Sequence, residues 1–342
     1  MLEPSDELLS VRARIARRLE RGAPPSLLGR ALEAAWAAVA SPRLARPLSI
    51  PEGARVIGVG SAVLGGAGKT PVAIALAAGL AERGHAVALI GHAYRARPER
   101  ARAVSPDDPV TLVGDDALSC ARKLAPHSVP VLVAPSRAEA LAYATREGRD
   151  VLVVDGLLQA APARITDAIL LLDAAAPWGA GRCPPLGDLR APPEALLAAS
   201  DHVAALVGAG ALARSAELPA GAVTLAASTT SAVDPDGRAH DLSSLARLRV
   251  GLAVAIARPG RLLATLAVHG IHPAAVLALA DHAAFGPSVE RRARRAAVDA
   301  WLTTARCATK LPPRFGGAPV LALEHSVDVG PLLPRLSAIR GA

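Results

Sequence analysis

One run of the 342-residue chain combines residue types that bind phosphate: Gly65-Gly66-Ala67-Gly68-Lys69-Thr70. Backbone N–H groups of a glycine-rich loop can surround phosphate oxygens, and the N-terminus of a following helix adds a positive dipole end. In such a loop Lys69 would reach the β- and γ-phosphates, and Thr70 would be a magnesium ligand. The run therefore predicts a site for ATP or GTP with Mg2+, although Val63 stands where the strict pattern has glycine.

Two acidic segments are candidate partners of this loop. Asp115 and Asp116 follow Gly114, and paired carboxylates can bind magnesium or accept a proton. A solvated turn or a helix cap is the commoner explanation of such a pair taken alone. Asp155 directly follows the apolar run 151–154. Because ligands of parallel sheets bind at the carboxyl ends of strands, Asp155 is a candidate magnesium ligand, with a plain strand-end turn as an equal alternative.

A third candidate is the pair Asp281-His282 in the last quarter of the chain. A carboxylate next to an imidazole can act as a general base or bind a substrate. An ordinary surface histidine is the default explanation of such a pair taken alone.

Short apolar runs alternate with helical segments around these residues. We expect strands at 56–59, 87–90, 129–134, 151–154, 168–172 and 202–207. Helices are expected after the glycine loop, from Pro71 to Arg83, and again at 136–147. This alternation predicts an α/β fold with a doubly wound, mostly parallel sheet, as in P-loop NTPases.

A stretch rich in Gly, Ser, Thr and Pro at 208–245 precedes a second, smaller α/β part. Its expected elements are a strand at 250–256, helices at 260–269 and 288–305, a strand at 320–323 and a closing helix at 330–339. We therefore expect three regions. They are an N-terminal helical region at 1–45, a nucleotide-binding domain at 46–215, and a smaller domain at 216–342 whose final helix can return to the first domain.

The N-terminal region interleaves apolar residues with arginines between residues 8 and 45. Pro24-Pro25 divides this stretch into two expected helices. A basic amphipathic helix can lie on an anionic membrane surface. On this pattern alone, ordinary packing within a domain explains the helices somewhat better.

Composition limits the classes of partner, compartment and membrane topology that suit the chain. The net charge of +8 suits an anionic partner such as nucleic acid, anionic lipid or a phosphorylated substrate, but a general arginine bias explains it equally well. Three distant cysteines without a CxxC pair argue against a zinc site or a disulfide scaffold and favour a reducing compartment. No apolar run reaches the roughly 20 residues of a membrane span, and the N-terminus lacks a signal core.

Taken in order, these motifs resemble the tetraacyldisaccharide 4'-kinase family of lipid A biosynthesis. The glycine loop, preceded by Val59-Gly60, resembles that family's loop, which also lacks the first glycine. Gly114-Asp115-Asp116 is similar to its Gly-Asp-Glu segment, and Asp155-Gly156-Leu157 to the end of its Asp-Asp-Gly-Phe motif. Further similar segments lie at 129–137, 185–192, 256–261, 281–285 and 302–310, so the resemblance covers most of the chain.

The resemblance implies an enzyme that transfers the γ-phosphate of ATP to the 4'-hydroxyl of a tetraacyldisaccharide 1-phosphate, the precursor of lipid A and lipopolysaccharide. It implies that Asp115 and His282 act together on the sugar hydroxyl, with Lys69 on the phosphates. Thr70, Asp155 and Asp116 would then lie beside Mg2+.

The same resemblance implies a peripheral enzyme at the cytoplasmic face of the bacterial inner membrane. It therefore raises membrane contact by the 8–45 region above ordinary packing. We expect a monomer that binds the acylated disaccharide, ATP and Mg2+, and no nucleic acid.

The chain departs from the family pattern at several positions, among them Ser61 for the asparagine after Val-Gly and Leu158-Gln159 for Gln-His. Val154 replaces the first aspartate of Asp-Asp-Gly, Gly91-His92-Ala93-Tyr94 stands for Ser-Arg-Gly-Tyr, and Thr303-Thr304-Ala305-Arg306-Cys307 stands for Thr-Thr-x-Lys-Asp.

Two alternatives stay open beside the lipid kinase. A kinase or ligase for a small soluble substrate would show no lipid dependence, and a non-catalytic relative would bind ATP without turnover. A GTPase is disfavoured, because the chain has no Asn-Lys-x-Asp segment to read guanine.

Overall fold

The computed structural model describes residues 11–44, 48, 50–94, 96–158, 165–208 and 218–336. These residues form two units, each with apolar clusters of its own. The larger unit takes its described residues from within 18–207, 218–227 and 327–336, and the smaller unit is built mainly from 228–326. The chain thus enters the smaller unit within strand β8 (Val223–Val233) and leaves it within strand β14 (Ala318–Val327).

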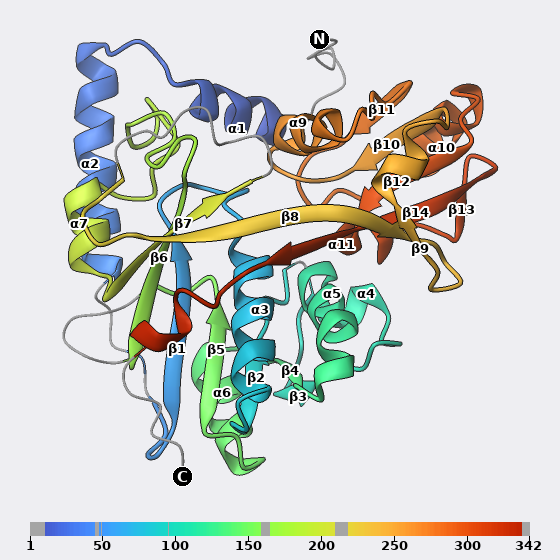
Figure 1. Cartoon of the computed structure of the whole chain (residues 1–342). Coiled ribbons are helices and arrows are strands. Elements are labelled where there is room, and N and C mark those ends of the chain that lie inside the picture. Colours follow the sequence, from blue (N-terminus) through green and yellow to red (C-terminus); the bar gives the residue numbers. More distant parts are fainter. Residues whose placement is uncertain are drawn as a thin grey trace. The chain divides into compact units, whose positions relative to one another are not determined.

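The larger unit is organised around a sheet with the strand order β8-β7-β6-β1-β5-β2-β4-β3 (Figure 1). Its other strands are β1 (Arg55–Ser61), β2 (Val87–Ile90), β3 (Arg102–Ala103), β4 (Val131–Val133), β5 (Val151–Asp155), β6 (Asp167–Asp173) and β7 (His202–Val207). All neighbours are parallel except β3, which is antiparallel to β4. The expected mostly parallel α/β sheet is confirmed.

Helices cover both faces of this sheet. Alternate strand residues enter two separate apolar clusters, with Ile57 and Val153 on one face and Val56 and Leu152 on the other, as the period-two geometry of a strand requires. The first cluster is completed by α3 (Lys69–Ala81) and α5 (Asp115–Leu124), and the second by α6 (Arg137–Arg146) and α7 (Pro193–Ala198). Figure 1 shows α3 and α5 side by side on one face.

Strand β1 lies at a reversal of the winding. Its two neighbours are β5 and β6, and the chain passes from one to the other across β1. In open α/β sheets the crevice outside the carboxyl ends of strands at such a point is where ligands bind. The glycine-rich loop leaves β1 at this end.

The N-terminal residues form α1 (Val11–Arg21) and α2 (Leu27–Leu44). The division at Pro24-Pro25 is confirmed, because both prolines lie between the helices. No helix among the described residues is long and apolar enough to cross a membrane.

The last described residues return to the larger unit. Val327, Val329, Leu332, Leu333 and Leu336 join the apolar cluster that contains α3. The expected closing helix at 330–339 is wrong for its described part, where only a 3-10 turn, η4 (Leu333–Arg335), is formed. Pro331 and Pro334 explain this, since a proline ring prevents the hydrogen bonds of a helix interior. Residues 337–339 lie outside the described part.

The smaller unit contains a parallel sheet with the order β11-β10-β12-β14. Its remaining strands are β9 (Ala239–Asp241), β10 (Val250–Val254), β11 (Ala275–Ala278), β12 (Ala300–Thr304) and β13 (Arg314–Phe315), and its helices are α8 (Leu242–Leu245), α9 (Pro259–Val268), α10 (Pro287–Arg295) and α11 (Ala305–Ala308). Leu252 and Leu302 pack on the face that includes α9, and Ala253 and Trp301 on the face that includes α10.

The expected helix at 288–305 is confirmed as far as Arg295 and is wrong beyond it. Helix α10 ends at Arg295, Ala297 turns the chain with φ of 48°, and β12 starts at Ala300. Trp301 is fully buried and packs edge-on against Phe315, with 5.8 Å between the two ring centroids. Tryptophan and threonine favour strands, and pairing of β12 with β10 and β14 overrides the helical preference of the surrounding alanines.

Candidate functional site

The β1–α3 connection has the strand–loop–helix form that the sequence predicted. Gly65, Gly66 and Gly68 have φ values of 87°, 64° and 80°, a left-handed conformation that residues with a Cβ seldom adopt. Gly68 is the N-cap of α3 and brings no side chain over the first helical turn. The loop backbone is therefore open to an anion at the N-terminus of a 13-residue helix.

Lys69, the first residue of α3, turns back toward the end of β1. Its Nζ donates a hydrogen bond of 3.2 Å to Oγ of Ser61, and that hydroxyl donates to the carbonyl of Val63. The ammonium group is thus held beside the loop that it would serve. Ser61 is a contact that sequence reasoning did not select as a site residue.

Thr70 and Asp155 meet at the carboxyl edge of the sheet. The Thr70 hydroxyl donates a 2.6 Å hydrogen bond to Oδ2 of Asp155, which ends β5 and is only 6% exposed. Strand β5 is paired with β1 so that Asp155 lies opposite Val59. An aligned hydroxyl and carboxylate provide the hard oxygen ligands that Mg2+ prefers, so these residues fit the ion.

The residue before this aspartate offers no ligand. Val154 is fully buried and belongs to the apolar cluster on the far face from Val153. A strand alternates its side chains, so Val154 and Asp155 point to opposite sides. At the end of β5 the carboxylate that meets Thr70 therefore comes from position 155.

Two arginines add positive charge near the same edge. Nη2 of Arg137, at the start of α6, donates to the carbonyl of Gly156 at 3.1 Å, and Nε of Arg190 donates to the carbonyl of Ser61 at 3.4 Å. Burial lowers the pKa of both guanidinium groups; for Arg190 the repulsion by Arg137 lowers it further, whereas Asp155 acts in the opposite direction on Arg137. Two partly desolvated cations that repel each other would be stabilised by a bound anion.

Arg190 is held by a segment that runs along the glycine loop. The backbone N–H of Arg190 donates to the carbonyl oxygen of Ala62 at 2.8 Å. The backbone N–H of Leu64 donates to the carbonyl oxygen of Asp188 at 2.9 Å. The Asp188 carboxylate in turn accepts the N–H of Ala180 at 2.8 Å and is almost fully buried. These contacts fix the loop entrance and the Arg190 backbone in one arrangement.

Helix α2 is attached to the same segment. Glu33 accepts hydrogen bonds from Nε and Nη2 of Arg182 and from the N–H of Cys183, and the Trp36 indole N–H donates to the carbonyl of Arg190 at 3.0 Å. Both anchors come from one side of α2. The helix also exposes large apolar residues, among them Leu28, Leu32 and Trp36 itself.

Asp115 and Asp116 form the first turn of α5. Gly114 precedes them with φ of 86°, and a Cβ there would lie 3.2 Å from the backbone of Ala93 and Tyr94. Asp115 is 4% exposed. Burial raises the pKa of the Cys120 thiol, and the charges of Asp155 and Asp116 raise it further. The carboxylates of Asp116 and Asp155 thus both raise the pKa of one buried thiol of α5.

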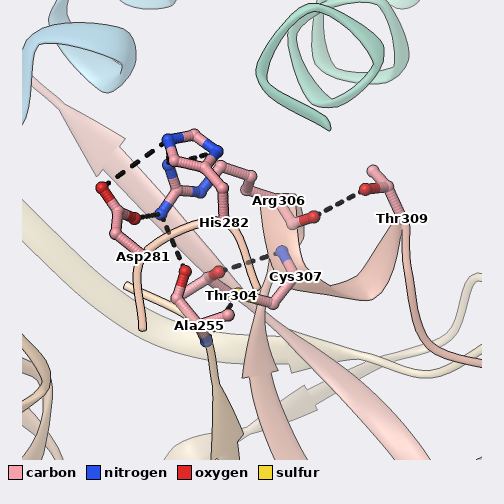
Figure 2. Close-up of polar contacts among 7 residues, drawn as sticks. All are labelled: Ala255, Asp281, His282, Thr304, Arg306, Cys307 and Thr309. Atoms are coloured by element: carbon pink, nitrogen blue, oxygen red, sulfur yellow. Dashed lines mark hydrogen bonds and ion pairs between the residues drawn. The ribbon is translucent and has the colours of Figure 1, made fainter. Parts of the chain in front are cut away.

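His282 belongs to the smaller unit, where it forms a polar cluster with Asp281 and Arg306 (Figure 2). Nη2 of Arg306 donates to Oδ1 of Asp281 at 2.6 Å, and Nη1 lies 3.0 Å from Nε2 of His282. His282 itself has a left-handed φ of 58°. The cluster joins the predicted Asp-His pair to an arginine that sequence reasoning did not select.

The predicted site residues therefore fall into two groups. Lys69, Thr70, Asp155, Asp115 and Asp116 are in the larger unit, and His282 is in the smaller one. Arg137, Arg190 and Arg306 join them as residues that sequence reasoning missed as site residues, although each lay inside a segment similar to the kinase family or at a departure from it.

Comparison with known proteins supports the resemblance. The family model described as tetraacyldisaccharide-1-P 4'-kinase matches residues 24–335. The chain is 36% identical over 285 residues to the tetraacyldisaccharide 4'-kinase of Anaeromyxobacter dehalogenans (strain 2CP-C), covering 78% of this chain and 75% of that protein. It is 34% identical over 259 residues to the enzyme of the same name from Chromobacterium violaceum, covering 75% and 74%.

A solved structure shares the fold. The chain matches the "apo" form of LpxK from Aquifex aeolicus in complex with ATP, with a TM-score of 0.67 and 19% identity. The match covers 90% of this chain and 96% of that one. The agreement extends over both units rather than over the nucleotide-binding loop alone.

Proposed function

We infer the function of this chain from its family, because it belongs to the tetraacyldisaccharide-1-P 4'-kinases. It is an ATP-dependent kinase of lipid A biosynthesis that phosphorylates the 4'-hydroxyl of a tetraacyldisaccharide 1-phosphate. The observation that carries this function is the Thr70–Asp155 hydrogen bond beside the glycine loop and Lys69. Thr70 and Asp155 supply the oxygen ligands, and Lys69 supplies the cation, that phosphoryl transfer from a nucleotide needs.

The larger unit would hold the nucleotide. The loop residues Gly65, Gly66, Ala67, Gly68, Lys69 and Thr70 surround the phosphates in this proposal, with Lys69 neutralising the β- and γ-oxygens. Thr70, Asp155 and Asp116 would hold Mg2+, which when bound neutralises charge on the phosphate oxygens. Arg137 and Arg190 stabilise the negative charge of the transferring group, since both are cationic and partly buried near the end of β1.

The acceptor hydroxyl must lose its proton as it attacks. A bond forms between the 4'-oxygen and the γ-phosphorus, the bond from that phosphorus to the β–γ bridging oxygen breaks, and ADP leaves. Asp115 accepts the hydroxyl proton in this proposal, and His282 assists in the same step. Asp115 lies in the first turn of α5, where the positive end of the helix dipole favours negative charge.

We also propose that α2 lies on the cytoplasmic surface of the inner membrane. Its exposed apolar residues are Leu27, Leu28, Leu32, Trp36 and Val39. Leu32 and Trp36 line an apolar hollow of about 300 Å³ with Pro184 and Pro185. The neighbouring helix α1 exposes Arg14, Arg18 and Arg21, whose charge suits anionic lipid. Acyl chains bound at this hollow would lie beside the 182–190 segment that carries Arg190.

An ATP-dependent phosphorylation assay on the tetraacyldisaccharide 1-phosphate tests the function. Wild type should transfer phosphate, whereas Lys69→Ala and Asp115→Ala should each lose about 10²-fold or more in kcat. Nucleotide binding should survive in Asp115→Ala. Absence of transfer by folded, ATP-binding wild type would refute the kinase, and full activity of Asp115→Ala would refute the proposed base. Phosphorylation of a soluble sugar in place of the lipid would instead favour a kinase for small soluble substrates.

A further inference from the structure

We propose that Arg306 is a positioning residue that sets the orientation of the His282 ring for phosphoryl transfer. The proposal rests on the proposed function, in which His282 assists at the acceptor hydroxyl. It goes beyond that function by assigning a role to a residue that stands where the family has lysine.

One guanidinium group contacts three partners in the smaller unit. Nη2 of Arg306 donates to Oδ1 of Asp281 at 2.6 Å and to the carbonyl of Ala255 at 3.2 Å. Nη1 faces the imidazole of His282, 3.0 Å from Nε2 and 3.5 Å from Nδ1. Figure 2 shows these contacts converging at the ends of β10 and β12.

The distances to the two ring nitrogens define the geometry. Nδ1 and Nε2 flank Cε1, so an atom this close to both cannot lie in the ring plane without colliding with a ring carbon. Nη1 of Arg306 therefore lies over a face of the His282 ring. A planar guanidinium stacks well on an aromatic face and can direct its other nitrogens elsewhere.

The backbone on both sides of this contact is fixed. The carbonyl of Ala255 accepts the N–H of His282 at 3.1 Å as well as Nη2 of Arg306, and the N–H of Ala255 donates to Sγ of Cys307 at 3.3 Å. Ala255 is fully buried directly after β10. One backbone unit thus ties the histidine backbone, the arginine side chain and α11 together.

The start of α11 fixes Arg306 itself. Thr304 caps this helix by accepting the N–H of Cys307, and the Thr309 hydroxyl donates to the Arg306 carbonyl at 2.7 Å. The guanidinium is only partly exposed, with 20% of the side chain accessible. Because its backbone and its guanidinium are both held, the Arg306 side chain loses little further conformational entropy when it orients the His282 ring.

The contacts of Asp281 indicate why position 306 needs the several N–H donors of a guanidinium group. Oδ1 of Asp281 is bound to Arg306, while its Oδ2 lies 3.6 Å from Nε2 of His282, within ion-pair distance of the imidazole. Arg306 thus binds the same carboxylate that faces the ring. A lysine could neutralise Asp281 as a point charge, but it could not stack on His282 and bind Asp281 and Ala255 at once.

A double-mutant cycle tests the proposal on the full-length enzyme with lipid acceptor and ATP. The variants are Arg306→Lys, His282→Ala and the double variant, with Arg292→Ala as a control because Arg292 is an exposed arginine of α10. We expect Arg306→Lys to lower kcat about 10-fold and His282→Ala about 10²-fold, while KM for ATP changes little. In the double variant, Arg306→Lys should add nothing to the loss from His282→Ala.

Additive losses in the folded double variant would overturn the proposal, because a purely structural arginine acts independently of the histidine. Unchanged kcat in Arg306→Lys would overturn it too. If His282→Ala keeps full activity, the proposed role of His282 fails and not merely that of Arg306. NMR of Arg306→Lys with labelled histidine gives a second readout that does not depend on activity. The His282 Cε1–H signal should move in that variant and stay in Arg292→Ala; a signal that does not move would overturn the proposal.

Discussion

The hydroxyl of Thr70 donates a 2.6 Å hydrogen bond to the carboxylate of Asp155 and so joins the first turn of α3 to the end of β5. The two residues are 85 positions apart in the chain. Both elements are adjacent to β1, one by sequence and one by pairing. The parallel sheet therefore brings together the two oxygens that we propose as magnesium ligands, with no contribution from Val154.

Removing the Thr70 hydroxyl should weaken magnesium use without unfolding the unit. We expect Thr70→Val, which keeps the side-chain shape, to raise the Mg2+ concentration for half-maximal activity and to lower kcat about 10-fold or more. Thr70→Ser retains the hydroxyl and is the matched control. Kinetics at varied Mg2+ measure both, and equal magnesium dependence in the valine and serine variants would contradict the assignment.

Gly68→Ala should damage the phosphate-binding loop. Gly68 has φ of 80°, and a Cβ there would lie 2.6 Å from Cδ2 of Leu206. We expect a stability loss of about 1 kcal/mol from the left-handed backbone, together with a large loss of ATP affinity.

Gly84→Ala is the control for backbone strain. Gly84 has φ of 88° but nothing within 4 Å of its added Cβ. It should lose similar stability and keep its ATP affinity. Calorimetric titration with ATP and thermal unfolding separate the two effects, and equal ATP affinity in both variants would show that the loop tolerates a side chain.

The ion pair between Glu33 and Arg182 should make the attachment of α2 sensitive to acid. Hydrogen bonding to Arg182 lowers the pKa of Glu33 below its ordinary value of 4.5, against the opposing effect of burial. A lowered pKa in the folded protein contributes stability that is fully present above pH 4.5 and is lost as the pH falls through the folded value.

Thermal unfolding of wild type and Glu33→Gln measures this contribution. The variant should melt at a lower temperature at pH 7, and the two Tm curves should converge below pH 4.5 as Glu33 is protonated. A constant difference in Tm down to pH 3 would mean that the charge of Glu33 is not what stabilises the contact.

The exposed face of α2 should determine membrane association. Leu28 and Leu32 are 70% and 49% exposed, so replacing both with glutamine should cost little stability and remove apolar area from the proposed membrane contact. Flotation with vesicles containing phosphatidylglycerol should show weaker binding than wild type. Leu248→Gln, at a 45% exposed leucine of the smaller unit, is the control. Equal flotation of all three proteins would argue against α2 as the contact.

Much of the larger unit could be predicted because its strands are short apolar runs separated by clear helices. Every expected strand between 56 and 207 is present, and the glycine loop lies where the strand–helix order places it. Thr70 and Asp155 were also selected from their positions, since parallel strands align their carboxyl ends.

The smaller unit was harder to predict because alanine fits both helices and strands. Residues 288–305 were expected as one helix, but pairing with β10 and β14 turns the second half into β12. Arg306 was missed for a different reason. Its role depends on Asp281 and Ala255, which lie 25 and 51 residues away, and no local pattern records such contacts.

The return of the chain through β14 has a consequence for synthesis on the ribosome. All members of the two apolar clusters of the smaller unit lie between Ala232 and Leu323, whereas the α3 cluster of the larger unit needs Val327 to Leu336. The larger unit therefore cannot complete this cluster until residue 336 has been synthesised, and the inserted unit can finish folding before it. A chain that stopped between Leu323 and Val327 would keep both apolar clusters of the smaller unit and lack the last part of the α3 cluster.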